Sequence, residues 1–286
     1  MKNWAQLALV IAALAVIVFG RGQFDASGEH AELRAWFFDV GQGDAILLDT
    51  PTQQQVLIDG GPDSSVVGEL GRVLPFGDKD IDLVIVTHNH ADHLKGIIEV
   101  LRHYTVASIW ISGAIHTTET YKDFLELVKQ KNIPTTVVSA GTTTAFGDLN
   151  GIVLFPLTSQ TGALPDNQHD ADVVTYWTYG TQSLLLTGDA ESEHEAAMLA
   201  RDVIRPTTIL KVGHHGSRTS TSQAFLEKVA PKYAVIQVGK NNKFGHPTAE
   251  TLARLTKFGS QVLRTDQEAT IRFDIWPDRT ERGLAH

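Results

Sequence analysis

Three histidines and an aspartate fall within six residues, as His88, His90, Asp92 and His93. Imidazole and carboxylate groups are ligands that suit zinc and manganese alike, and the chain has no cysteine that could offer a thiolate instead. Side chains two residues apart on an extended chain point the same way, so His88 and His90 can converge. The segment predicts a site for one or two divalent cations.

Two more polar segments follow apolar strands. Asp189 ends LLLTGD, at a strand end where α/β proteins place functional groups, and we interpret it as a ligand, as the N-cap of a helix from Glu191, or as both. His214 and His215 end another strand, and neighbours on an extended chain point opposite ways. Alternation leaves open which of the two faces the site, and we favour His214 as the ligand and His215 as a supporting or substrate-facing group.

Other polar residues give weaker indications. Gln42 and Asp44 lie in the Gly-rich turn GQGD, which is either a plain hairpin turn or a segment beside the metals. Ser217 precedes a helix whose free N–H groups could hold a phosphate oxygen, whereas Ser220 is better explained as an N-cap. We assign purely structural roles to three histidines: His103, His116 and His194.

The elements that must position these residues alternate along the chain. A buried strand runs into the histidine cluster, and two runs of strands, each followed by alternating helix and strand, predict two sheets packed face to face with helices outside. Strands are expected at 33–39, 44–49, 54–59, 83–86, 106–112, 135–139, 151–156, 173–179, 182–187, 207–212, 233–238, 261–264 and 269–275, and helices at 64–74, 93–103, 119–131, 191–201, 221–229 and 248–258.

The N-terminal residues differ in character from the rest. An apolar run at 4–19 predicts that residues 1–22 are a signal peptide or a membrane anchor, followed by a linker at 23–31 and a hydrolase domain at 32–286. We therefore expect a protein outside the cytoplasm, either anchored or secreted. The net charge of -9 argues against a broad basic surface for nucleic acid, although bound cations would attract phosphate locally.

Several motifs in register carry a family resemblance. His-x-His-x-Asp-His after a buried strand is the hallmark of the metallo-β-lactamase superfamily, and the chain resembles it. The further motifs FFDVGQGDAILL (37–48), LIDGG (57–61), LLLTGD (184–189), LKVGHHGS (210–217) and FGHP (244–247) are similar to the soluble domain of ComEC-type DNA-internalisation proteins, here in a stand-alone form. The resemblance covers about residues 34 to 275. It implies a four-layer αββα sandwich of the α/β class, with a metal site at one edge between the sheets.

The resemblance also implies roles for individual residues. His88 and His90 would hold a first metal, Asp92 and His93 a second, Asp189 would bridge both, and His214 would complete the second. Asp59 would support these ligands from behind, a role that we also expect of Asp44 from its place in the GQGD turn. A third ligand to the first metal is expected from QHDADVV, as His169, Asp170 or Asp172.

The predicted activity follows from such a site. Two cations lower the pKa of a bridging water and clamp the oxygens of the reacting centre, which suits hydrolysis of a phosphodiester, with single-stranded DNA favoured as the partner. We take Asp92, His215 and His246 as catalytic, with His215 or His246 assisting the leaving group, and Gln42 and Ser217 as substrate-binding. The alternatives are an ester or lactam hydrolase of the same fold and a non-catalytic accessory module for DNA uptake.

Overall fold

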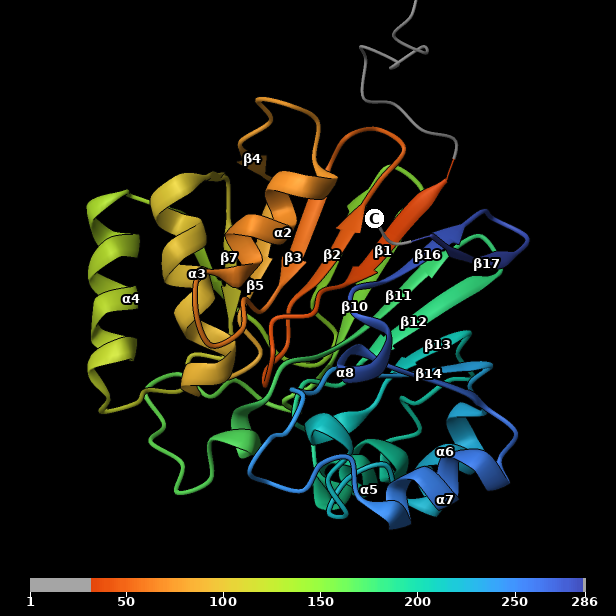
Figure 1. The fold of residues 1–286 in the computed structure, drawn as a ribbon. Helices are drawn as coiled ribbons and strands as arrows, with labels where there is room; N and C mark the ends of the chain where they lie inside the picture. The colour runs from red at the N-terminus through yellow and green to blue at the C-terminus, as the bar shows by residue number, and fades with distance from the viewer. Residues whose placement is uncertain (1–31, 285–286) are drawn as a thin grey trace, which may run out of the picture.

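The protein folds into two β-sheets packed face to face between two layers of helices, as the computed structural model of residues 32–284 shows (Figure 1). This four-layer αββα arrangement confirms the predicted fold class. The predicted signal or anchor at 1–22 and the linker at 23–31 lie outside the described residues. Among residues 32–284, no helix is long and apolar enough to cross a membrane.

The first sheet has eight strands in the order β17-β16-β1-β2-β3-β5-β7-β8. The end of the chain returns to this sheet, because β16 pairs antiparallel with β1 from Leu33 opposite Ile275 to Phe37 opposite Ile271. The strands are β1 (Leu33–Phe37), β2 (Ile46–Asp49), β3 (Gln55–Ile58), β5 (Leu83–Ile85), β7 (Ile109–Ile111), β8 (Thr135–Val137), β16 (Ile271–Ile275) and β17 (Thr280–Gly283).

The second sheet has seven strands in the order β15-β14-β13-β12-β11-β10-β9. Strands β12 to β15 run parallel to one another, so the segments that follow β12, β13 and β14 all leave from the same edge. The strands are β9 (Thr143–Phe146), β10 (Leu149–Phe155), β11 (Val174–Tyr179), β12 (Gln182–Leu186), β13 (Ile209–Lys211), β14 (Tyr233–Ile236) and β15 (Gln261–Arg264).

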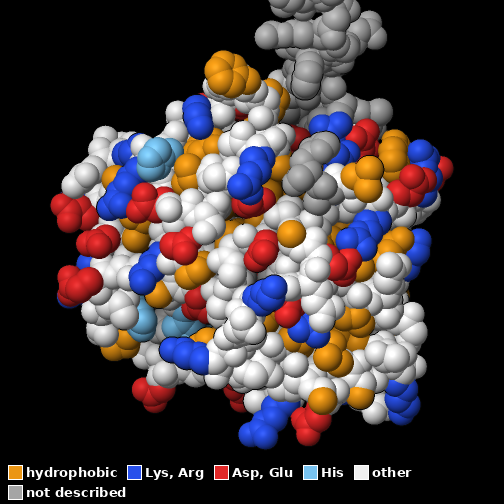
Figure 2. Space-filling view, viewed as in Figure 1, with side chains coloured by type: hydrophobic (Ala, Val, Ile, Leu, Met, Phe, Trp, Pro, Cys, Tyr) orange, Lys and Arg blue, Asp and Glu red, His pale blue; other side chains and the backbone are white. Residues whose placement is uncertain are grey.

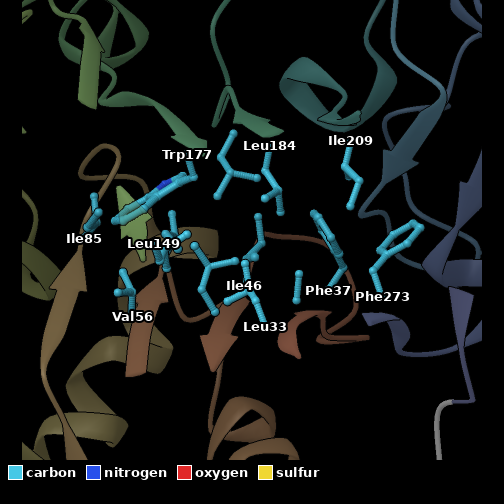
Figure 3. Packing of buried hydrophobic residues seen from close by; sticks show 14 of the residues in the cluster. Leu33, Phe37, Ile46, Val56, Ile85, Leu149, Trp177, Leu184, Ile209 and Phe273 are labelled. Atoms are coloured by element: carbon cyan, nitrogen blue, oxygen red, sulfur yellow. The ribbon is translucent and has the colours of Figure 1, made fainter. Parts of the chain in front are cut away.

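The core between the sheets comes from the inward-facing residues of both (Figure 3). Phe37 and Phe273 of the first sheet meet edge to face, with ring centroids 6.0 Å apart, while Trp177 and Leu184 enter from the second sheet. Fully burying an aliphatic or aromatic side chain stabilises a fold by about 1.5–3 kcal/mol, so this layer joins the two sheets strongly.

Helices cover the outer face of each sheet. The apolar sides of α2, α3 and α4 pack on the first sheet, and those of α5, α6 and α7 pack on the second. The helices are α2 (Ser65–Val73), α3 (Ala91–His103), α4 (Glu119–Gln130), α5 (Ser192–Ala200), α6 (Gln223–Val229), α7 (Ala249–Lys257) and α8 (Thr265–Glu268), and two short 3₁₀ turns are η1 (Gln168–Ala171) and η2 (Gly213–Gly216).

Three strands were not predicted from the sequence, and a fourth shares only Val106 with the strand predicted at 106–112. Two of them, β4 (Asp80–Ile81) and β6 (Thr105–Val106), have two residues each and form a small sheet of their own. The other two, β9 and β17, lie at sheet edges and are polar and largely exposed, so they lack the buried apolar alternation that identifies a strand.

Candidate metal centre

The predicted histidine cluster lies at the junction of β5 and α3. His90 is the N-cap of α3, so His88 and His90 precede the helix while Asp92 and His93 lie in its first turn. His88 Nε2 and His90 Nδ1 are 3.0 Å apart. The helix approaches the segment after β3 so closely that a side chain at Gly96 would collide with the backbone of Gly60. Close packing therefore fixes the position of the cluster.

Asp189 lies at the centre of the site. Its Oδ2 is 3.4 Å from His93 Nε2 and 3.5 Å from His215 Nε2. His169 Nε2 and His214 Nε2 are 3.8 and 3.9 Å from the same oxygen. The alternative role of Asp189 as a helix N-cap does not hold, because Glu191 occupies that position in α5. Four imidazoles therefore surround one carboxylate oxygen.

The side chains divide into two groups that could each hold a cation. One contains His88, His90 and His169, and the other contains Asp92, His93 and His215. Asp189 joins both, since it also forms groups with His88 and His93 and with His169 and His214, and the ligand atoms of each group lie within 4.8 Å of one another. Ligands of one tetrahedral zinc at about 2.0–2.1 Å lie roughly 3.4 Å apart, so these spacings fit a metal centre.

Unpartnered buried atoms support that fit. His93 Nε2, His215 Nε2 and Asp189 Oδ1 are buried and have no hydrogen-bond partner within residues 32–284. A buried polar atom without a partner costs about 1–3 kcal/mol, so several around one point indicate that a ligand satisfies them. The chemistry of this set, imidazole and carboxylate, suits divalent zinc or manganese.

The two adjacent histidines after β13 differ from expectation. His214 and His215 both adopt left-handed backbone angles, with φ of 47° and 53°, rather than the extended conformation assumed from the sequence. As a result it is His215 that joins Asp92 and His93, whereas His214 is 25% exposed and its Nδ1 is 3.2 Å from Glu191 Oε1. The geometry favours His215 over His214 as the ligand of the second group.

Asp59 holds His93 in place from behind. Its carboxylate accepts hydrogen bonds from Thr87 N at 2.8 Å and from Thr87 Oγ1 and His93 Nδ1 at 2.7 Å each. The bond to Nδ1 turns Nε2 of the same ring toward Asp189. Burial raises the pKa of Asp59 to about 6, and His93 opposes that rise. The position matches the supporting role predicted for Asp59.

A buried ion pair under the site was not anticipated. Lys211 is fully buried, pairs with Asp44, and donates a hydrogen bond to Gly188 O at 2.7 Å. Its Nζ is 3.7 Å from Asp189 Oδ1. Burial favours the neutral amine, but Asp44 and then Asp189 raise the pKa of Lys211 above its usual value. The one sign of this pair in the sequence is that Lys211 is a charged residue at the end of an otherwise apolar strand, β13.

The polar stretch before β11 contributes one candidate ligand, His169, and one side chain that supports a ligand, Asp172. His169 lies in η1 and joins His88 and His90, while Asp172 Oδ1 is 3.5 Å from His88 Nδ1. Burial, and then Asp189, raise the pKa of Asp172 to about 6. Asp170 turns away and contacts His194 Nε2 at 3.0 Å. Of the three open alternatives, the geometry favours His169 as the ligand.

The protonation of the histidines differs between the two groups. Burial, and then neighbouring imidazoles, lower the pKa of His88, and burial and His169 lower that of His90 to about 4. In the group of Asp92, His93 and His215, burial also lowers the pKa of His215. Asp189 and Asp44 outweigh burial, however, and raise that pKa to about 9. Metal binding there would release protons, since only a neutral imidazole is a ligand.

A small pocket of about 210 Å³ opens over these side chains. Phe244 was not predicted to line it. Gln42 was expected beside the metals, and its Oε1 accepts a hydrogen bond from Gly239 N at 3.2 Å. The pocket is lined by Gln42, His90, Asp92, His169, Asp189, His214, His215, Phe244 and His246.

The remaining predicted residues lie outside this pocket. Ser217 is buried, and its Oγ is 2.9 Å from Thr219 Oγ1. The prediction that Ser220 is an N-cap is wrong, because Ser222 caps α6 and Ser220 Oγ donates to Gly213 O instead.

The three histidines given structural roles lie in different surroundings. His194 completes the capping box of α5, and His103 Nδ1 is 2.8 Å from Glu99 O at the end of α3. The ring of His116, by contrast, is 6.2 Å from that of His90, which places it at the edge of the metal site.

A family model and two curated relatives match most of this chain. The family model described as the metallo-beta-lactamase superfamily matches residues 38–240. ComE operon protein 3 of Bacillus subtilis is 31% identical over 252 residues, covering 82% of this chain and 32% of that protein. Recombination protein 2 of Haemophilus influenzae is 30% identical over 248 residues, covering 85% and 29%. The chain thus spans about a third of the length of these relatives.

Solved structures agree at the level of the fold. The metallo-beta-lactamase fold protein YhfI of Bacillus subtilis aligns with a TM-score of 0.56 at 12% identity, over 85% of this chain and 99% of that one. At such low identity the agreement concerns the arrangement of helices and strands alone.

Proposed function

We infer the function from the premise that this chain belongs to the metallo-beta-lactamase superfamily. It is a metal-dependent hydrolase of that superfamily, and we propose that it cleaves phosphodiester bonds in single-stranded DNA. The observation that carries the proposal is the pair of ligand groups around the shared Asp189. His88, His90 and His169 would hold one cation, and Asp92, His93 and His215 the other. Such a pair supplies a reactive hydroxide and neutralises phosphoryl oxygens.

The chain's own side chains provide the rest of the chemistry. Burial, and then His214 and His215, lower the pKa of His246, so at neutral pH its imidazole is neutral and has one N–H to donate. From the pocket wall that N–H can bond an oxygen of the phosphate or of the leaving group. His215 is buried, with Nδ1 bonded to Gln237 O at 2.9 Å, so it suits a ligand better than a proton donor.

Charge supports a locally held phosphodiester. The chain carries a net charge of -9, and acidic and basic side chains are interspersed over the described face that Figure 2 shows. Broad binding of nucleic acid needs many lysines and arginines, so attraction must come from the site itself. The name of one of these relatives, Recombination protein 2, refers to recombination, a process that acts on DNA.

We also propose that the domain works outside the cytoplasm. The support is the apolar run at 4–19, which is typical of a signal peptide or a membrane anchor. Cell fractionation followed by protease treatment of intact cells would test this. The proposal is contradicted if the domain is protected from an external protease in intact cells and stays protected after the outer layers of the cell have been opened.

The test of the activity uses the full chain, stripped of metal with a chelator and then supplied with manganese or zinc. Cleavage of a labelled single-stranded oligonucleotide should return with metal and be absent from an Asp189→Ala variant. An ester and a lactam substrate, assayed in parallel, should be left intact. Metal-dependent turnover of either one without DNA cleavage would replace this proposal with the small-molecule alternative, and metal-independent DNA binding without cleavage would favour an accessory module.

A further inference from the structure

One aromatic side chain at the mouth of the pocket has no part in the metal centre. Phe244 lies in the segment between β14 and α7, residues 239–247, which we call the rim loop. Phe244 is 54% exposed although its neighbours Gly245 and His246 lead directly into the site. Its ring is near-parallel to that of His246, at 19°, with centroids 6.0 Å apart. A flat apolar surface therefore faces solvent beside the reacting centre.

The exposure of Phe244 does not come from a loose loop. Asn242 Oδ1 accepts hydrogen bonds from Phe244 N and His246 N at 3.1 Å each, and Asn242 Nδ2 donates to His246 O at 2.7 Å. The far end of the loop packs on the histidine turn, since a Cβ at Gly216 would lie 2.6 Å from Pro247 Cβ. The aromatic ring is thus carried on a backbone tied to the metal site.

Positive charge accompanies the ring. Lys243 Nζ lies 5.3 Å from the centroid of the Phe244 ring, and Lys240 of the same loop is exposed. In an acidic chain these two lysines belong to the loop that carries Phe244 and His246 into the pocket lining, and Lys243 is close enough to the ring to contact a phosphate beside it. An exposed aromatic face beside basic side chains is the arrangement by which proteins hold single-stranded nucleic acid, one base stacking on each ring.

We propose that Phe244 stacks on the nucleobase next to the phosphate being cleaved, while Lys243 contacts the backbone of the same strand. The inference rests on the proposed phosphodiesterase activity and adds that the substrate is recognised as an unpaired nucleotide. A base paired within a duplex has no free face for the ring, so the site selects single strands. Stacking does not depend on base identity, so cleavage shows little sequence preference.

The experiment compares Phe244→Leu with the wild type on two single-stranded oligonucleotides, one fully natural and one in which every base is replaced by an abasic residue. On the natural strand the substitution should lower kcat/KM about tenfold, because a leucine offers no flat face for stacking. On the abasic strand the two proteins should be equal. Phe244→Trp should restore cleavage of the natural strand. An equal loss on both strands would overturn the proposal.

A matched control and a binding assay separate this inference from the activity beneath it. Phe76 is more exposed than Phe244 and lies outside the pocket lining, so Phe76→Leu should change neither cleavage nor binding. Binding of the natural strand is measured by fluorescence anisotropy with the metal-loaded full chain. If the wild type binds without cleaving and Phe244→Leu weakens binding about tenfold, the stacking role stands and the nuclease activity fails. If the wild type cleaves and Phe244→Leu cleaves equally well, the nuclease activity stands and the stacking role fails.

Discussion

The floor and the rim of the pocket are built in different ways. On the floor, Asp189, Lys211 and His215 are buried and tied to partners from several strands. On the rim, Phe244 and His246 belong to a single loop whose shape comes from hydrogen bonds between its backbone and the side chain of Asn242. Substitutions on the floor should therefore disturb folding and metal binding together, whereas substitutions on the rim should alter catalysis and leave both intact.

The largest effect is expected at Asp189. Asp189→Ala removes the carboxylate shared by both ligand groups, so cleavage should fall by about 10³-fold or more, equivalent to at least ~4 kcal/mol of transition-state stabilisation. Bound metal per chain, measured by elemental analysis, should fall as well. Asp202→Ala on the surface serves as the control. Full metal content with full activity would place Asp189 outside the centre.

Lys211 tests whether the floor also supports the fold. Lys211→Met leaves the buried Asp44 carboxylate with His215 alone as a charged neighbour, which should lower the free energy of unfolding by about 3–5 kcal/mol in urea titrations of metal-free protein. Adding Asp44→Asn should recover part of that loss. The control is Lys228→Met, which removes the exposed partner of Asp202 and should change nothing measurable. Similar results for both lysines would show that the buried pair has no special role.

His214 and His215 are adjacent in sequence, so comparing their variants tests which of the two belongs to the metal-binding floor. His215→Ala should weaken binding of one cation by about 100-fold or more, at least as much as the loss of a supporting group around a metal ligand. His214→Ala should have a smaller effect, because His214 is partly exposed and turns toward Glu191. Calorimetric titration of the metal-free variants measures both. The opposite ranking would restore His214 as the ligand.

The smallest effect is expected on the rim, at His246. His246→Ala should lower kcat/KM about tenfold, the value of one neutral hydrogen bond, with metal content and melting temperature unchanged. His246→Gln should retain most activity because an amide N–H also donates. The pKa of His246 lies below its ordinary value, so its charged form is lost below neutral pH and the profile from pH 7 to 9 should not depend on it. A His246-dependent fall in that range would instead indicate a proton donor.

Local patterns explain what the sequence could predict. His88 and His90 follow a strand and His93 opens a helix, so ordinary periodicity brings them together, and the same reasoning found the strand end at Asp189. The two sheets were predicted because most of their strands are buried apolar runs. Residue-by-residue reasoning therefore placed most of the buried strands and brought the histidines of the β5–α3 junction together.

Irregular backbone and long-range packing account for what was missed. Neighbouring side chains alternate only on an extended chain, so the sequence did not reveal that a left-handed turn at His214 and His215 brings His215 beside Asp92 and His93. The Lys211–Asp44 pair joins β13 to the turn before β2, a contact between distant segments that no local pattern reveals. Phe244 reaches the pocket through a loop held by the side chain of Asn242.

The pairing of β16 with β1 has a consequence for the order of assembly. Strand β1 (33–37) is made long before its partner β16 (271–275), so one edge of β1 stays open until residues 271–275 have been made. Contacts between such distant segments form slowly, and an open strand edge can pair with another chain while it waits. The first sheet therefore cannot be completed before β16 has been made, and until then the open edge of β1 can pair with another chain.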